Sequence, residues 1–241
     1  MKLNLIKNKT EEQAVVLCGH GSRDNNYLRE LIEFEEKLKQ KLSKIKIFHC
    51  FIEINSPGIE ECLKSLSNRF TKIFFFPLLL FEGKHMIQDI RKKIYNFKGS
   101  EKNKIILIEK LSLINDILPI MLKNPEFKTK YDTIITSCSI SKNPNVIKEL
   151  EIYTSKLSSR LGITNRIFHF VGDESLVYEA LKKKNCRSQN IILHPIFFFN
   201  GFLYRKNIET IKQFFKITVI KPLNYNESII SIVSKKISEL L

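Results

Sequence analysis

The sequence lacks the features that mark exported or membrane-spanning proteins. Its longest apolar run, IFFFPLLLF (73–81), is far shorter than the roughly 20 residues that cross a bilayer. The first residues, MKLNLIKNKTEEQ, contain no apolar core of a signal peptide. The five cysteines are odd in number and form no CxxC pair, which argues against a disulfide framework or a structural zinc site. We therefore expect a cytoplasmic protein with reduced thiols and no membrane span.

Motifs that bind nucleotides are also absent. The chain contains neither GxxxxGK[ST] nor GxGxxG, although GHGSRD (19–24) is a glycine-rich turn of the kind that can cradle phosphate. Histidine phosphatases use an Arg-His-Gly element, and Gly19 occupies the position that the arginine would need. A phosphate-handling site at this turn is therefore not favoured.

The chain is strongly basic, with 40 Lys and Arg against 25 Asp and Glu and a formal charge of +15. Lys, Ile and Asn are abundant throughout, which favours a compositional bias with many lysines on solvated helix faces. No segment interleaves aromatic residues with this charge, so a nucleic-acid partner is not expected. The excess charge could still attract a polyanionic ligand to a cleft.

The two halves of the chain repeat one another. The block LCGHGSRDNN (17–26) aligns with TSCSISKNPN (136–145) at an offset of 119, and each follows an apolar, β-rich run. The same offset relates FIEINSPGIEECL to FVGDESLVYEAL. One residue is then lost, and at an offset of 118 both halves contain the pattern P-x3-F-x-G-x6-I. We infer an internal duplication.

The duplication predicts two lobes, residues 1–124 and residues 125–241, which are ordinary domain sizes. In the first lobe, apolar runs at 14–18, 46–53, 72–80 and 104–108 alternate with three helix-like segments. These segments are 25–42, 56–70 and 84–97; the second is expected to begin with Ser56 as N-cap and Pro57 as the first helical residue. The second lobe repeats this order and ends in a helix from about Glu227.

Continuous apolar strands that alternate with helices indicate an α/β fold. Each lobe is therefore predicted to be a small, mostly parallel sheet flanked by helices, and the two lobes are related by the duplication.

Three polar residues in the first lobe follow successive predicted strands. They are His20, Glu53 and His85. In open parallel sheets, ligands bind outside the carboxyl ends of the strands, where such residues gather. Two imidazoles and a carboxylate suit a divalent first-row metal.

The second lobe has none of these three residues. Ser139, Gly172 and Leu203 occupy the corresponding positions, although the framing Pro, Phe, Gly and Ile are kept. A loss of all three together is not what a purely structural role would predict. For the other three histidines, His49, His169 and His194, we expect core or strand-edge roles.

The segments HGSRD, FIEINSPGIEECL and PLLLFEGKHMIQDI together resemble the class II tetrapyrrole chelatases, the sirohydrochlorin cobaltochelatases and ferrochelatases of the CbiX/SirB type. The resemblance covers the whole chain, as expected for the long two-lobe form. It implies that His20 and His85 are metal-binding and catalytic residues and that Glu53 is their companion carboxylate. One active site per chain is expected, with the second lobe closing the cleft.

The resemblance also implies a substrate. Sirohydrochlorin carries eight carboxylates, and we expect five residues to contact it: Ser22, Arg23, Lys84, Arg205 and Lys206. The divalent metal, Co²⁺ or Fe²⁺, is itself a substrate, so no organic cofactor is expected. The two lobes would act as a pseudo-dimer within a monomer.

Two alternatives remain open at this level. A ferrochelatase acting on a heme-pathway porphyrin would keep the chemistry and change the macrocycle, and the hydrophobic FFFNGFLY segment leaves room for a less carboxylated ring. A non-catalytic protein that stores or delivers metal or tetrapyrrole would use the same ligands without turnover.

Overall fold

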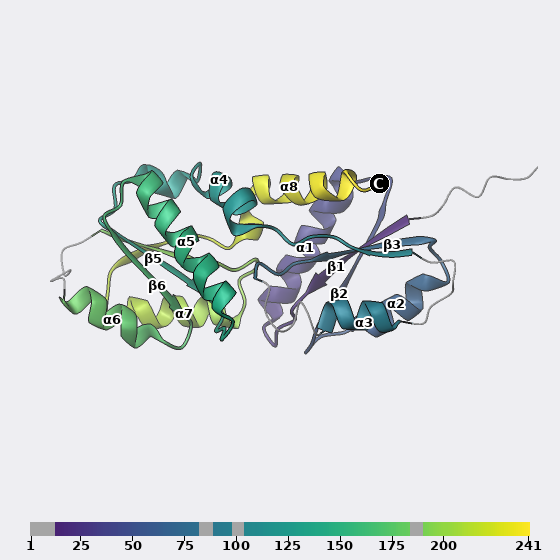
Figure 1. Cartoon of the computed structure of the whole chain (residues 1–241), viewed down its shortest axis with the longest axis horizontal. Helices are drawn as coiled ribbons and strands as arrows, with labels where there is room; N and C mark the ends of the chain where they lie inside the picture. Colours follow the sequence, from purple (N-terminus) through teal and green to yellow (C-terminus); the bar gives the residue numbers. More distant parts are fainter. Residues whose placement is uncertain (1–12, 82–88, 98–103, 184–189) are drawn as a thin grey trace, which may run out of the picture.

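The computed structural model describes residues 13–81, 89–97, 104–183 and 190–241, and shows two α/β lobes (Figure 1). The strands of the first lobe are β1 (Gln13–Gly19), β2 (Lys46–Phe51), β3 (Lys72–Pro77) and β4 (Lys104–Leu107). Its helices are α1 (Asn25–Lys41), α2 (Ile59–Ser67) and α3 (Lys92–Asn96). A connecting region follows, with a π-helix at Leu113–Ile117, α4 (Leu118–Met121) and a 3-10 turn at Pro125–Lys128.

The second lobe repeats this order. Its strands are β5 (Thr133–Cys138), β6 (Asn165–Phe170), β7 (Ile191–Pro195) and β8 (Ile217–Val219). Its helices are α5 (Pro144–Leu161), α6 (Glu174–Lys183), α7 (Phe202–Lys212) and α8 (Glu227–Ser238), with a 3-10 turn at Leu223–Tyr225 before the last. No described helix has the length and apolar character needed to span a membrane.

Both sheets are parallel and have the same strand order. It is β2-β1-β3-β4 in the first lobe and β6-β5-β7-β8 in the second. Even single hydrogen bonds recur: Leu78 N–H donates to Cys18 O at 2.8 Å, and Ile196 N–H donates to Ser137 O at 2.7 Å. The predicted fold class, two duplicated α/β lobes, is confirmed.

Each face of the first sheet has its own apolar layer. On β1, Val15 and Leu17 belong to the cluster that includes α1, whereas Val16 and Cys18 pack in the cluster that includes α2. This separation follows from the strand period of two, which sends neighbouring side chains to opposite faces. Helices on both faces explain why the strand is apolar at each position from 14 to 18 rather than at alternate ones.

Several element boundaries differ from the predicted ones; the strand predicted at 46–53, for example, ends at Phe51. The second helix begins at Ile59 with Gly58 as N-cap, not at Pro57 with Ser56 as N-cap. The reason is that the Pro57 carbonyl accepts a hydrogen bond from Phe51 N–H at 2.9 Å, so this residue still belongs to the edge of the sheet. The Glu61 carboxylate then accepts from Gly58 N–H at 3.0 Å and closes the first turn.

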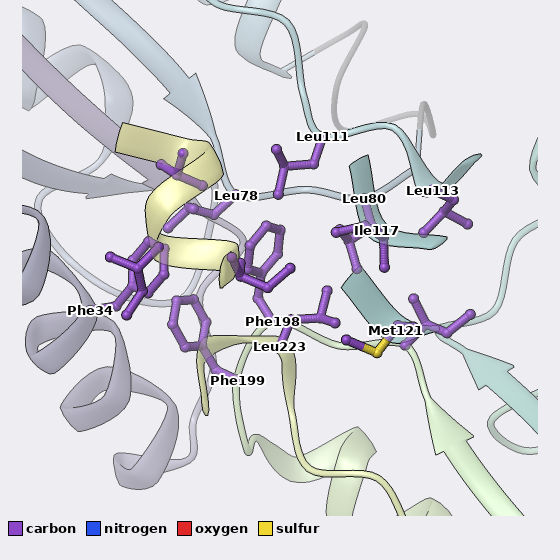
Figure 2. Packing of buried hydrophobic residues seen from close by; sticks show 14 of the residues in the cluster. Phe34, Leu78, Leu80, Leu111, Leu113, Ile117, Met121, Phe198, Phe199 and Leu223 are labelled. Carbon is purple, nitrogen blue, oxygen red and sulfur yellow. The ribbon is translucent and has the colours of Figure 1, made fainter. Parts of the chain in front are cut away.

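The predicted strand at 72–80 also ends early, at Pro77. The next residues leave the sheet because Leu78 and Leu80 enter a core that belongs to both lobes (Figure 2). Of the helix predicted at 84–97, the structure describes a π-turn at 89–91 and α3, and the rest lies outside the described residues. The final helix begins at Glu227, as predicted.

The largest apolar cluster joins the lobes. Figure 2 shows Phe34 of α1 facing Phe198 and Phe199 of the second lobe, with ring centroids 6.5 and 5.9 Å from Phe34. Leu111, Leu113, Ile117, Met121 and Leu223 extend the same cluster. Helix α8 reaches across to pack on α1 (Figure 1), where Lys37 Nζ lies 2.9 Å from Glu227 Oε1. The sequence division at residue 124 therefore does not separate two independent cores.

A buried carboxylate adds a polar connection between the lobes. Glu30 of α1 is 1% exposed, yet it accepts hydrogen bonds from three groups of the second lobe. They are Asn200 N–H at 2.8 Å, Asn224 Nδ2 at 3.1 Å and the Tyr225 hydroxyl at 2.8 Å. The contact with Glu30 raises the pKa of Tyr225, because the phenol must stay protonated to donate.

Candidate functional site

His20 and Glu53 meet where two neighbouring parallel strands end. His20 follows β1 and Glu53 follows β2, and Glu53 N–H donates to His20 O at 3.1 Å. Their side chains also meet, with His20 Nε2 3.3 Å from Glu53 Oε1. The side chains are 39% and 47% exposed, so both are accessible to a ligand. This is the edge at which open parallel sheets bind ligands.

The glycine after His20 permits this contact. Gly21 has φ +98°, a left-handed conformation, and a Cβ at this position would lie 1.9 Å from Glu53 O. Next to it, Ser22 N–H donates to Asn55 Oδ1 at 2.7 Å. The loop after β1 and the loop after β2 are thus in direct backbone contact, which only a residue without a side chain allows.

The third predicted ligand, His85, lies outside the described residues, as does Lys84. Within the part of the chain that the structure describes, no three His, Cys, Asp or Glu side chains form a group that could hold a metal ion. The structure therefore brings together two members of the predicted set, an imidazole nitrogen and a carboxylate oxygen. These donor types suit iron and cobalt. The complete ligand set stays a prediction.

A cavity of about 800 Å³ lies between the lobes and has His20 in its wall. Its first-lobe wall comes from residues 20–27 with Ile54 and residues 78–81. Its second-lobe wall comes from Ser139, residues 196–199 and residues 201–205. Leucine, isoleucine and aromatic side chains make up most of this surface. A cavity of this volume can hold a large organic ligand.

Both lobes contribute equivalent positions to this cavity. Ser139 and Leu203, which correspond to His20 and His85, lie in the second-lobe wall. The loop after β1 and the loop after β5 therefore face the same space, but the second lobe offers the Ser139 hydroxyl where the first lobe offers the His20 imidazole. Gly172, the counterpart of Glu53, has φ +108° and is not in the wall.

The predicted substrate contacts fall into three groups. Ser22, Arg23 and Arg205 line the cavity. Lys206 is exposed and is not in the cavity wall, whereas Arg205, the residue before it on α7, pairs with Asp24 of the first lobe. Lys84 belongs to the residues that the structure does not describe. Assignment of these residues to substrate binding stays a prediction.

Asp24 and Tyr27 lie in the cavity wall and were not among the predicted sites. Asp24 forms an ion pair with Arg205 across the lobes, and its Oδ1 accepts from Asn26 N–H at 3.0 Å as the N-cap of α1. Tyr27 packs edge-on against Phe199, with ring centroids 5.2 Å apart, and its burial raises the phenol pKa. The Asp before a helical pattern is a recognisable N-cap signal, but its cross-lobe pairing has no sequence signature.

The other histidines lie elsewhere. His49 is in β2, and its Nδ1 contacts the carboxylate of Glu35 on α1. His169 is buried and lies 3.3 Å from Asn207 Nδ2. His194 is fully buried, with its Nε2 2.9 Å from the Tyr153 hydroxyl, and desolvation lowers its pKa to about 3. None of the three lines the cavity.

Two duplicated parallel lobes, with a histidine and a carboxylate beside the cleft, define a two-lobe α/β protein with a candidate metal site at the strand ends. Comparison with known proteins agrees with this class. The family model CbiX matches residues 14–124. The sirohydrochlorin cobaltochelatase of Sulfolobus acidocaldarius is 32% identical over 113 residues, which are 46% of this chain and 89% of that protein. The chain belongs to the CbiX family.

Solved structures show the same fold over the whole chain. SirB from Bacillus subtilis with Fe³⁺ superimposes with a TM-score of 0.75 at 18% identity and covers 95% of both chains. The sirohydrochlorin chelatase SirB from Bacillus subtilis subspecies spizizenii, in complex with cobalt, gives 0.73 at 18% identity over 95% of this chain and 94% of the other. CbiX, the terminal enzyme for siroheme biosynthesis in denitrifying bacteria, gives 0.68 at 11% identity over 95% and 99%. The predicted family is confirmed.

Proposed function

We propose that this protein is a metal chelatase that inserts Co²⁺ or Fe²⁺ into sirohydrochlorin. The observation that carries this proposal is the pairing of His20 with Glu53, 3.3 Å apart, beside an interlobe cavity of about 800 Å³. Membership in the CbiX family supports it, as does the name of the cobaltochelatase relative.

The chemistry requires two kinds of group. The incoming metal must lose water, and the free macrocycle must lose two pyrrole protons. A neutral imidazole does both tasks, since the same lone pair binds a metal or accepts a proton. Glu53 fixes the orientation of the His20 ring and offers a second acceptor. His85 completes the proposed ligand set.

The second lobe is proposed to hold the macrocycle rather than the metal. Ser139 and Leu203 replace the two histidines at the equivalent positions, and neither is a strong metal ligand. Phe202 and Leu203 are exposed at the cavity, where they offer an apolar surface to the ring. One active site per chain follows, in a monomer whose lobes replace two subunits. No organic cofactor is needed, and the proposed location is the cytoplasm.

A second macrocycle is favoured by one observation. The described cavity wall is mostly apolar, and its charged side chains are Arg23, Asp24 and Arg205. Two cations, one of them paired, are few for the eight carboxylates of sirohydrochlorin. A heme-pathway porphyrin with fewer carboxylates is therefore the second candidate, and it would keep the same metal chemistry.

A spectrophotometric assay separates these candidates. The purified full chain is mixed with sirohydrochlorin or protoporphyrin, each with Co²⁺ or Fe²⁺, and metal insertion is followed by the change in the absorption bands. We expect turnover with sirohydrochlorin and loss of turnover in Glu53→Gln. Turnover with protoporphyrin alone would assign the second candidate. Binding without turnover in every combination would instead identify a protein that stores or delivers metal or tetrapyrrole.

A further inference from the structure

We propose that Asp24 is a positioning residue that holds the Arg205 guanidinium at the cavity wall, where it binds one carboxylate of the macrocycle. This inference rests on the proposed function, because it assigns a partner to the substrate in the same cavity. It gives Asp24 a role in substrate binding and makes the second lobe a source of specificity.

Asp24 is itself held firmly. Its side chain is only 6% exposed, and Oδ1 accepts the hydrogen bond from Asn26 N–H that caps α1. Its own N–H donates to Ser22 Oγ at 3.1 Å, within the loop that carries His20. The second carboxylate oxygen, Oδ2, is the one that meets Arg205 Nη2. The charge on Asp24 is therefore fixed relative to the candidate metal site.

Arg205 comes from the other lobe and reaches the same loop. It lies in the first turns of α7, which begins just after Gly201. A Cβ on Gly201 would lie 3.5 Å from the Tyr27 ring and 3.7 Å from Ser22 Oγ, so the start of α7 is in contact with the loop after β1. The Asp24–Arg205 pair therefore spans the interlobe boundary beside the cavity.

The guanidinium retains donors for a ligand. Arginine has five N–H donors, and within the described part of the chain the Arg205 side chain has one polar contact, from Nη2 to Asp24. The side chain is 39% exposed and lines the cavity. A planar fork of donors suits a carboxylate, which it binds in bidentate fashion. Because Asp24 already restricts Arg205, a ligand loses less binding energy to ordering the side chain.

A carboxylate on the edge of the macrocycle is the ligand group that fits. Arg205 and His20 line the same cavity, so one molecule can be held by its rim while its centre faces the imidazole. Among the described residues of the wall, Arg23 is the other cation. With the surroundings mostly apolar, each ionic contact to the ring gains strength from the low local dielectric.

Substitutions can distinguish two roles of the Asp24–Arg205 pair: orienting Arg205 for the ligand, or only joining the two lobes. Asp24→Asn keeps a side-chain oxygen that caps α1 but removes the charge. Arg205→Gln removes the charged fork, and Arg205→Lys keeps the charge without the fork. Arg29→Gln is the matched control, because Arg29 pairs with Glu33 on an exposed part of α1 outside the cavity. All are compared as full-length proteins.

The readout is macrocycle affinity, measured by fluorescence quenching without metal, for sirohydrochlorin and for its methyl ester. We expect Arg205→Gln to raise the Kd for sirohydrochlorin about tenfold or more, the range for loss of a hydrogen bond to a charged group. Asp24→Asn should raise it less, and Arg205→Lys should recover part of the loss. Affinity for the ester should be insensitive to all three substitutions, as should Co²⁺ affinity measured without the macrocycle.

The outcomes are distinguishable. An unchanged Kd in Arg205→Gln, with a lower urea midpoint of unfolding, would show that the pair only joins the lobes and would overturn this inference. An equal loss of affinity for acid and ester would overturn it as well. If the unmodified protein binds neither compound, the proposed function itself fails and the inference fails with it.

Discussion

Nε2 of His20 lies 3.3 Å from Oε1 of Glu53, although the residues are on separate loops. The distance is set by the sheet, because β1 and β2 pair in parallel with Cys18 opposite Cys50. The two loops leave neighbouring strands at the same edge and remain in backbone contact. The pair is therefore supported by the sheet, as the proposed metal site requires.

This pair supplies the first prediction. His20→Ala removes an imidazole nitrogen and should reduce Co²⁺ affinity and metal insertion severely, while Glu53→Gln keeps the shape and should reduce affinity about 10–100-fold. Isothermal titration with Co²⁺ and the insertion assay measure both effects. Glu60→Gln, an exposed residue on α2, is the control and should behave as the unmodified protein. Undiminished metal binding in both site variants would contradict the assignment.

The glycine of the same loop supplies the second prediction. Gly21→Ala forces a Cβ to within 1.9 Å of the Glu53 carbonyl at a positive φ, and the fold should lose about 2–4 kcal/mol of unfolding free energy. Gly58→Ala is the matched control, since φ is −71° and no atom lies within 4 Å of the added methyl. Urea unfolding measures both. Equal midpoints for the two variants would show that the loop adapts without strain.

The buried carboxylate at the lobe boundary supplies the third. Glu30→Gln places an amide among three donors, so at least one donor loses its acceptor, and unfolding free energy should fall by about 1–3 kcal/mol. Glu33→Gln is the control on the same helix, because its side chain is 62% exposed. It should change stability by less than about 0.5 kcal/mol. Chemical denaturation gives the comparison, and a similar small effect for both would mean that Glu30 does not tie the lobes.

The fourth prediction concerns pH. Burial lowers the His194 pKa from 6.5 to about 3, so the unfolded chain binds a proton that the folded chain does not. Stability from this group is complete above pH 6.5 and is lost as pH falls from 6.5 toward 3, by about 2 kcal/mol at pH 5. His194→Gln should flatten the fall of the urea midpoint between pH 7 and 5. Parallel curves for the two proteins would contradict this role.

Much of the fold was accessible from the sequence. Apolar runs alternating with helical segments predicted the parallel sheets, and the repeat predicted that both lobes have the same succession of strands and helices. The proximity of His20 to Glu53 was also expected, because the carboxyl ends of adjacent parallel strands meet at one edge. The start of α2 was predicted wrongly, because the Pro57 carbonyl accepts a hydrogen bond from Phe51 N–H. Helix N-cap preferences depend on the residues of the first turn and contain no information about this contact.

The cross-lobe contacts could not be predicted in this way. Asp24 pairs with Arg205, and Glu30 accepts hydrogen bonds from Asn200 and Tyr225, only when the two lobes are packed together. Neither the spacing nor the type of these residues distinguishes them from the exposed charges around them.

The sequence by itself determined the elements, their order and the duplication, because the hydrophobic periodicity of strands and helices depends on residues that are close together in the chain. Only the tertiary structure decided which loops share the cavity and which charges meet across it. Those relations depend on how the common apolar core around Phe34 and Phe199 fixes one lobe against the other, and burial of that core involves residues far apart in the chain.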